Sequence, residues 1–141
     1  SAIVSTEGNQ DCHIILRGGD KGTNYDAESV AAVCAEIEKS GHRPHVMVDF
    51  SHANSSKQFK RQMDVCEDVC KQIAGGSELI SGVIIESHLV EGRQDLKSGQ
   101  TLEDLVYGQS ITDGCIGWED SEKALFALAE AVEERRRKHQ K

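Results

Sequence analysis

The feature that most constrains this chain is a regular alternation of short apolar runs with longer amphipathic segments. Three apolar runs of the kind that form buried strands lie at residues 12–16, 46–50 and 80–85. The residues that close these runs recur at a near-constant interval, because Arg17, His52 and Glu86 are 35 and 34 residues apart. Strand–helix units of constant length predict an α/β fold with a parallel sheet, since each crossover helix returns the chain to the same end of the sheet. The runs do not alternate with polar residues, so helices are expected to bury both faces of the strands.

An amphipathic helix is predicted after each of the first two runs. Asp26 is expected to cap the first helix, whose apolar positions recur at helical spacing up to Gly41, a residue suited to a helix C-terminus. Ser55 or Ser56 is expected to cap the second helix, which should end at the glycine pair 75–76.

A third helix is predicted near the C-terminal end of the chain. Asp120 or Ser121 is expected to open it, and the positive charges at residues 135–138 suit its C-terminus, where the helix dipole favours cations. The residues expected on its apolar stripe are Ala124, Leu125, Leu128, Ala131 and Val132. Residues 90–117, before this helix, are expected to be irregular, and a connector of that length is more often functional than passive.

Composition and charge exclude several classes of function. The 141-residue chain carries 16 Lys and Arg against 24 Asp and Glu, a net charge of −8 that disfavours a nucleic-acid partner. No apolar run approaches the roughly 18 to 20 residues of a membrane span, and residues 1–10 lack the apolar core of a signal peptide, so the predicted location is cytoplasmic. The five cysteines are expected to be reduced thiols, and Cys66 and Cys70, one helical turn apart, should face the core.

The residues that close the three runs carry chemistry that a buried strand does not need. Arg17 supplies a cation, His52 an imidazole and Glu86 a carboxylate, and in a parallel sheet all three would lie at the same edge. Imidazole and carboxylate ligands suit Mn²⁺, Fe²⁺, Co²⁺ or Zn²⁺, and the pattern does not choose among them. Glu86 follows an apolar run directly, so its charge needs a cation or a metal nearby. Arg17 is equally consistent with a solvated loop residue.

Four segments carry a more specific signal when they are read together and in order. They are Ile15-Leu16-Arg17-Gly18-Gly19, Asp49-Phe50-Ser51-His52-Ala53-Asn54-Ser55, Gly82-Val83-Ile84-Ile85-Glu86-Ser87 and Ser110-Ile111-Thr112-Asp113-Gly114-Cys115-Ile116-Gly117-Trp118-Glu119. These segments resemble the 3-deoxy-D-arabino-heptulosonate 7-phosphate (DAHP) synthases of the microbial, feedback-regulated type. The resemblance runs over nearly the whole chain but covers only the C-terminal part of such an enzyme.

The resemblance implies a (β/α)8 TIM barrel, which takes about 250 residues when complete. Residues 1–141 would form the C-terminal portion of this single catalytic domain, with its last three strand–helix units. Such a transferase condenses phosphoenolpyruvate with D-erythrose 4-phosphate to give DAHP and phosphate, the first step of the shikimate pathway to aromatic amino acids. We therefore expect activity from the complete barrel and none from this portion alone.

The resemblance also implies roles for individual residues. Arg17 would bind the phosphate of phosphoenolpyruvate, since a guanidinium fork matches phosphate oxygens. His52, Glu86 and Asp113 would be ligands of an essential divalent metal ion, with Mn²⁺ preferred and Fe²⁺, Co²⁺ or Zn²⁺ as alternatives. Arg17 and His52 are the expected catalytic residues, His52 through proton transfer beside the metal. The family's fourth ligand, a cysteine, belongs to the N-terminal half, and Gly114 replaces the usual alanine after Asp113.

The expected partners are the two substrates, an aromatic amino acid effector and the missing N-terminal part of the barrel, with neither nucleic acid nor membrane. A homo-oligomer is also expected. Two alternatives stay open. The related synthase of 3-deoxy-D-manno-octulosonate 8-phosphate shares the barrel and the phosphoenolpyruvate chemistry, although residues 110–119 argue against it. A non-catalytic half-barrel that serves as an interaction or regulatory piece would fold without a metal site.

Overall fold

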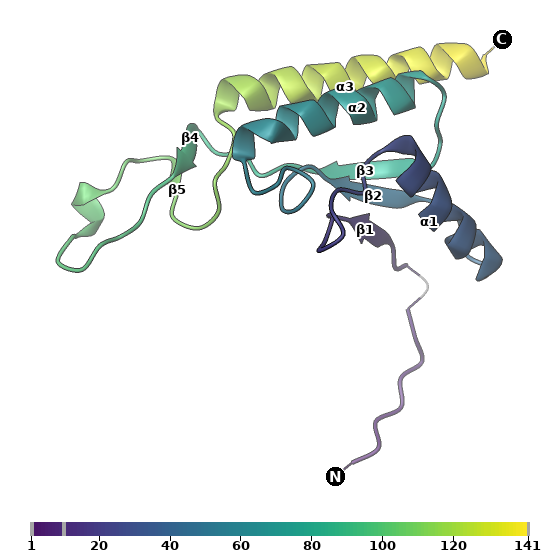
Figure 1. Cartoon of the computed structure of the whole chain (residues 1–141), viewed down its shortest axis with the longest axis horizontal. Helices are drawn as coiled ribbons and strands as arrows, with labels where there is room; N and C mark the ends of the chain where they lie inside the picture. The colour runs from purple at the N-terminus through teal and green to yellow at the C-terminus, as the bar shows by residue number, and fades with distance from the viewer. Residues whose placement is uncertain (1, 10, 141) are drawn as a thin grey trace.

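A computed structural model describes residues 2–9 and 11–140. Its elements, in order, are β1 (Ile14–Leu16), α1 (Ala27–Lys39), β2 (Val46–Asp49), a 3-10 helix (Phe59–Arg61), α2 (Gln62–Ala74), β3 (Ile80–Ile84), β4 (Val90–Arg93), a second 3-10 helix (Leu102–Asp104), β5 (Gln109–Ser110) and α3 (Trp118–His139). The first three strands form one parallel sheet in the order β1-β2-β3, as the repeat predicts. β4 and β5 pair separately, in an arm that projects away from this sheet (Figure 1).

The helices cover one face of the three-stranded sheet. Side chains that alternate along a strand point to opposite faces, and Val46 and Val48 of β2 lie in a continuous core with residues from all three helices. The intervening Met47 is only partly buried, and its neighbour in register, Ile15, is 41% exposed. The expectation that both faces of the strands are buried is therefore wrong for the described residues, because no element lies over the Ile15 side of the sheet.

The first helix begins and ends where the sequence predicts. The Asp26 carboxylate accepts hydrogen bonds from the backbone N–H of Ser29 at 2.9 Å and from its hydroxyl at 2.7 Å. The side-chain hydrogen bond from Ser29 is the main reason why the pKa of Asp26 is lowered. Gly41, just past the end of α1, has a φ of +80°, the left-handed conformation that glycine adopts at little cost.

The starts of the other two helices differ from the prediction. Neither Ser55 nor Ser56 caps α2, since turns and a 3-10 helix intervene and α2 begins only at Gln62. The Ser55 hydroxyl instead donates to the carbonyl of His52, at 3.2 Å. α3 begins at Trp118, before the predicted Asp120 or Ser121.

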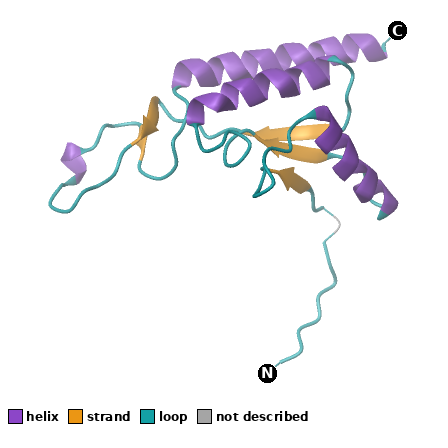
Figure 2. Ribbon diagram, in the orientation of Figure 1, coloured by secondary structure: helices purple, strands orange, loops and turns teal. Residues whose placement is uncertain are grey.

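The long α3 lies alongside α2 over the sheet (Figure 2). Ala124 and Ala131 are buried there, whereas Leu125 is 58% exposed and so does not belong to the predicted apolar stripe. Cys66 and Cys70 of α2 face this packing, as predicted, and burial raises the pKa of the Cys66 thiol to about 12. None of the helices in the described part of the chain combines the length and apolarity needed to cross a membrane.

Residues 90–117 are more ordered than the sequence suggests. Besides β4 and β5, Gly92 and Cys115 exchange two backbone hydrogen bonds, and the N–H of Ile116 donates to the carbonyl of Glu86 at 3.0 Å. The arm therefore leaves the sheet after β3 and returns to the end of the same strand. This return brings residues 113–116 beside the carboxyl edge of the sheet.

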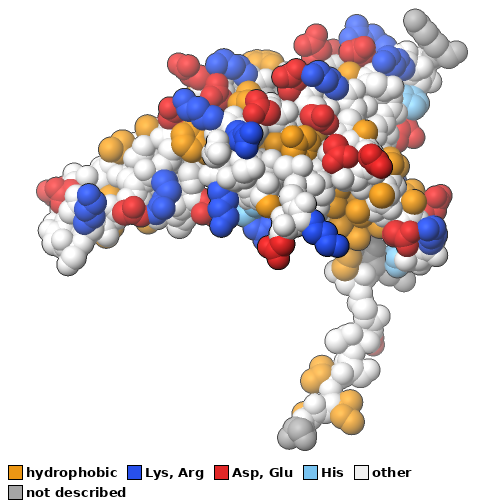
Figure 3. Space-filling model, in the orientation of Figure 1, with side chains coloured by type: hydrophobic (Ala, Val, Ile, Leu, Met, Phe, Trp, Pro, Cys, Tyr) orange, Lys and Arg blue, Asp and Glu red, His pale blue; other side chains and the backbone are white. Residues whose placement is uncertain are grey.

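Charges of both signs are mixed on the outer surface of the helices. Figure 3 shows Lys and Arg side chains interspersed with Asp and Glu over α2 and α3, without a continuous basic patch on the face in view. Pairs such as Lys71 with Glu67 and Lys123 with Asp120 lie one helical turn apart.

The cap of α1 gives a first prediction. Replacing Asp26 with Ala should lower the free energy of unfolding of the chain by about 1 kcal/mol at neutral pH, because the N–H of Ser29 loses its acceptor. Asp26→Asn, which keeps an acceptor oxygen, should lose less. Since the folded state lowers the pKa of Asp26, the difference between the wild type and Asp26→Asn should shrink as the pH falls through that lowered pKa. Urea unfolding at several pH values measures this, and equal stability of the wild type and Asp26→Ala would contradict it.

Candidate metal centre

Three of the predicted residues meet at the carboxyl edge of the sheet. His52 follows β2, Glu86 follows β3, and Asp113 lies on the returning end of the arm. One ligand atom from each lies within 4.8 Å of the other two, and His52 Nε2 is 3.6 Å from Glu86 Oε1. Among the described residues, this is the one group of three or more His, Cys, Asp or Glu side chains with such geometry. The predicted convergence of an imidazole and two carboxylates is thus present.

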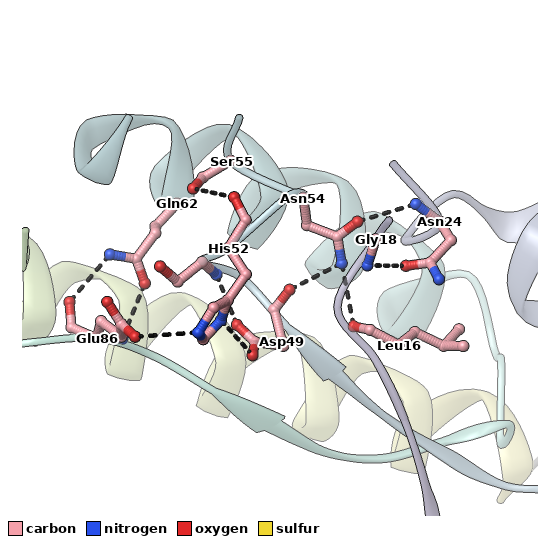
Figure 4. Close-up of polar contacts among 10 residues, drawn as sticks. Leu16, Gly18, Asn24, Asp49, His52, Asn54, Ser55, Gln62 and Glu86 are labelled. Atoms are coloured by element: carbon pink, nitrogen blue, oxygen red, sulfur yellow. Dashed lines mark hydrogen bonds and ion pairs between the residues drawn. The ribbon is translucent and has the colours of Figure 1, made fainter. Parts of the chain in front are cut away.

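His52 is held at both its backbone and its ring. Its φ of +51° is left-handed, a conformation that is unfavourable for a residue with a side chain and that often occurs at functional sites. The turn is stabilised by the N–H of Lys57, which donates to the His52 carbonyl at 2.9 Å. At the ring, Nδ1 lies 2.8 Å from Oδ2 of Asp49, whose other oxygen accepts from the N–H of Ser51 (Figure 4). The ring therefore presents Nε2, and not Nδ1, to Glu86.

Glu86 is fixed by a side chain from the start of α2. Gln62 is fully buried, and its amide donates to the Glu86 carbonyl and accepts from the Glu86 N–H, each at 2.9 Å (Figure 4). This pair of bonds holds the backbone of Glu86 after β3 ends. The carboxylate Oε1 faces His52, whereas Oε2 is buried without a hydrogen-bond partner among the described residues. A buried, unpaired carboxylate oxygen is costly, and a cation bound there would remove the cost.

The residue after Asp113 packs closely against the 3-10 helix that precedes α2. A Cβ placed on Gly114 would lie 3.1 Å from Cδ1 of Phe59, so glycine at this position lets the arm pack tightly against the 3-10 helix before α2. The neighbouring thiol, Cys115, has its pKa raised mainly by burial and also by the charges of Glu86 and Asp113. Negative charge is therefore concentrated at this point of the sheet edge.

Arg17 lies on the loop after β1, and it is exposed. The buried side chain of Asn54 joins this loop to β2, donating to the carbonyls of Leu16 at 3.0 Å and of Asp49 at 2.8 Å. Gly18 has a φ of +71°, and a Cβ there would be 2.8 Å from that of Ala53. These contacts fix the backbone beside Arg17.

Sequence reasoning missed the three buried polar residues that support the site. Asp49 was visible as a charged residue inside an apolar run, and Asn54 and Gln62 as polar residues in the segment that follows it. The roles of Asn54 and Gln62 depend on partners distant in the chain, Leu16 and Glu86, which the local pattern does not reveal. Asp49 contacts Ser51 and His52, which are close in the sequence, but its burial depends on the packing of the sheet.

Comparison with known proteins identifies the family. Residues 1–125 match the sequence model of the DAHP synthetase I family. The chain belongs to the DAHP synthetase I family. It is 71% identical over 137 residues to a phospho-2-dehydro-3-deoxyheptonate aldolase of Haemophilus influenzae, covering 97% of this chain and 37% of that protein. It is 64% identical over 136 residues to the Phe-sensitive phospho-2-dehydro-3-deoxyheptonate aldolase of Escherichia coli K12, covering 96% of this chain and 38% of that protein.

Comparison with a solved structure supports the assignment to the DAHP synthetase I family. The phospho-2-dehydro-3-deoxyheptonate aldolase of Francisella tularensis SCHU S4 is 46% identical and superposes with a TM-score of 0.86. The match covers 95% of this chain and 38% of that protein. The chain therefore spans well under half the length of these DAHP synthetase relatives, and the family resemblance predicted from its four segments is confirmed.

The two hydrogen bonds between the Gln62 side chain and the Glu86 backbone give a second prediction. Gln62→Leu should lower the free energy of unfolding by about 1 to 3 kcal/mol, because it leaves the Glu86 N–H without an acceptor in a part-buried position. Gln58→Leu is the matched control, since Gln58 is exposed and makes no side-chain capping bond. Urea unfolding measures the loss of stability in each variant. Equal losses in Gln62→Leu and Gln58→Leu would show that the hydrogen bonds of Gln62 do not stabilise the fold.

Proposed function

We propose that this chain forms part of the catalytic site of a DAHP synthase. The reaction is the condensation of phosphoenolpyruvate with D-erythrose 4-phosphate, which gives DAHP and phosphate on the route to aromatic amino acids. The observation that carries the proposal is the meeting of His52, Glu86 and Asp113 at the carboxyl edge of a parallel sheet, in a member of the DAHP synthetase I family. Active sites of (β/α)8 barrels lie at this edge of the strands.

We further propose that residues 1–141 are the C-terminal portion of a single (β/α)8 barrel and contribute its last three strand–helix units. The exposed Ile14 and Ile15 of β1, at the edge of the three-stranded sheet, support this proposal. The missing N-terminal part of the barrel would cover them, with a strand beside β1 and further strands over the open face of the sheet, and it would add further substrate-binding groups. Regulation by an aromatic amino acid is supported by relatives named Phe-sensitive and Trp-sensitive. The homo-oligomeric state and the cytoplasmic location stay predictions.

The proposed cofactor is a divalent metal ion held by His52, Glu86 and Asp113. Two ligand atoms that are each about 2.1 Å from one ion are at most roughly 4.2 Å apart, so the three side chains, within 4.8 Å of one another, need only small movements. The unpaired Oε2 of Glu86 supports the fit. One imidazole and two carboxylates suit Mn²⁺, which we propose, ahead of Fe²⁺, Co²⁺ or Zn²⁺. When bound, the ion would act as a Lewis acid on the aldehyde oxygen of erythrose 4-phosphate.

The side chains divide the remaining work. Arg17 would bind the phosphate of phosphoenolpyruvate through two parallel N–H groups, and its exposure leaves those donors available. Asn54 would keep the Arg17 loop in position against β2. Nδ1 of His52 lies beside Asp49, and Nε2 faces Glu86, another proposed metal ligand. Metal binding through Nε2 is therefore the first role proposed for this residue. Its part in proton transfer stays a prediction.

Complementation tests the proposed reaction. The chain is mixed with the N-terminal segment of the Haemophilus influenzae relative that it lacks, and consumption of phosphoenolpyruvate is followed with erythrose 4-phosphate and Mn²⁺. We expect consumption only when both pieces are present. Glu86→Gln should slow the consumption of phosphoenolpyruvate by at least roughly 100-fold. Loss of a residue that only hydrogen-bonds to a metal ligand already costs up to that factor, and loss of the ligand itself should cost no less. Glu122→Gln, the same change at an exposed position of α3, is the control.

Two results would contradict the proposal. Absence of consumption in the mixture would favour the alternative of a non-catalytic interaction or regulatory piece. A complemented Glu86→Gln chain that turns over as fast as Glu122→Gln would contradict the assignment of the metal ligand.

A further inference from the structure

We propose that Asp49 is a positioning residue that keeps the proton of the His52 imidazole on Nδ1 and directs the Nε2 lone pair toward the metal. The proposal rests on the metal centre proposed above and adds a residue to it. Asp49 touches neither a ligand position of the ion nor, by this proposal, the substrate. It acts through His52.

The surroundings of Asp49 support this role. It is the last residue of β2, its side chain is 5% exposed, and it lies beside the buried Val48 and Phe50. A buried carboxylate needs hydrogen-bond donors for its oxygens. The N–H of Ser51 supplies one at 2.8 Å to Oδ1, and His52 Nδ1 lies 2.8 Å from Oδ2. Because an ionised carboxylate only accepts hydrogen bonds, Nδ1 must donate.

The proton on Nδ1 decides what the other ring nitrogen can do. In a neutral imidazole, one nitrogen carries the proton and the other carries a free lone pair, and only the latter binds a metal. With Nδ1 protonated, the lone pair is on Nε2, which lies 3.6 Å from Oε1 of Glu86. The hydrogen bond to Asp49 therefore selects the tautomer that can serve the metal centre.

The same hydrogen bond fixes the direction of the ring. The His52 backbone is held in its left-handed turn by Lys57 and Ser55, which both donate to its carbonyl. The bond from Nδ1 to Asp49 adds a second fixed point, on the imidazole ring. With both in place, rotation of the ring away from Glu86 would break a part-buried hydrogen bond.

Asp49→Asn separates this role from a purely structural one, because its shape is unchanged. If the amide oxygen keeps the bond from Ser51, the amide NH₂ faces Nδ1 and donates to it. The imidazole proton then lies on Nε2. In that tautomer Nε2 has no free lone pair and cannot bind the metal. Asp113→Asn is the matched control, since it removes a proposed ligand and leaves the Asp49–His52 pair intact.

Two measurements on the full chain test the proposal. Multiple-bond ¹H–¹⁵N NMR of the metal-free chain at alkaline pH reports which His52 nitrogen carries the proton, and electron paramagnetic resonance of free Mn²⁺ gives the affinity. We expect Nδ1–H in the wild type and Nε2–H in Asp49→Asn, with Mn²⁺ binding weakened about 10- to 100-fold. Asp113→Asn should also bind Mn²⁺ more weakly but keep Nδ1–H.

An Nε2–H tautomer in the wild type would overturn the proposal, and this result does not depend on whether any variant folds. So would an Asp49→Asn chain with the circular dichroism and the Mn²⁺ affinity of the wild type. Failure of the wild-type chain to bind Mn²⁺ would overturn the metal centre itself, a result distinct from the wrong tautomer.

Discussion

Parallel pairing of β2 with β3 fixes where the functional side chains can lie. Asp49, the last residue of β2, pairs with Ile84, the last residue of β3, so the chain leaves both strands at the same edge of the sheet. His52 and Glu86 follow within a few residues and therefore meet. The arm that starts after β3 returns to that strand through the hydrogen bond from Ile116 to Glu86, and it adds Asp113 to the same edge. Each of the three proposed ligands thus depends on this strand pairing.

Buried polar side chains convert this approximate meeting into a defined site. Gln62 takes over the hydrogen bonds of the Glu86 backbone where the strand ends, and Asn54 ties the loop after β1 to the end of β2. The Asp49 carboxylate lies within hydrogen-bond distance of Nδ1 of the His52 ring. Buried polar groups that find all their partners make a structure rigid and specific. Supported side chains of this kind hold a binding site in its productive geometry before the ligand arrives.

The sequence predicted the parts of the structure that depend on local pattern. Apolar runs closed by polar residues predicted the parallel sheet, and the meeting of the first two proposed ligands, His52 and Glu86, followed from the edge that those runs share. Asp113 came only from resemblance to a family. The start of α2 could not be predicted, because Ser55 bonds to His52 instead of capping the helix. The two-residue strand β5 exists only through its pairing with β4, and the bonds of Gln62 cross 24 residues of chain. Such features arise from tertiary contacts, which local periodicity does not encode.

We propose that this member of the DAHP synthetase I family holds a divalent metal ion with the side chains of His52, Glu86 and Asp113. X-ray diffraction from crystals of the chain grown with Mn²⁺, recorded at the manganese absorption edge, tests it most directly. We expect one strong anomalous peak in contact with His52 Nε2, a Glu86 carboxylate oxygen and an Asp113 carboxylate oxygen. A well-ordered site without such a peak, or a peak that His52 and Glu86 do not contact, would contradict it.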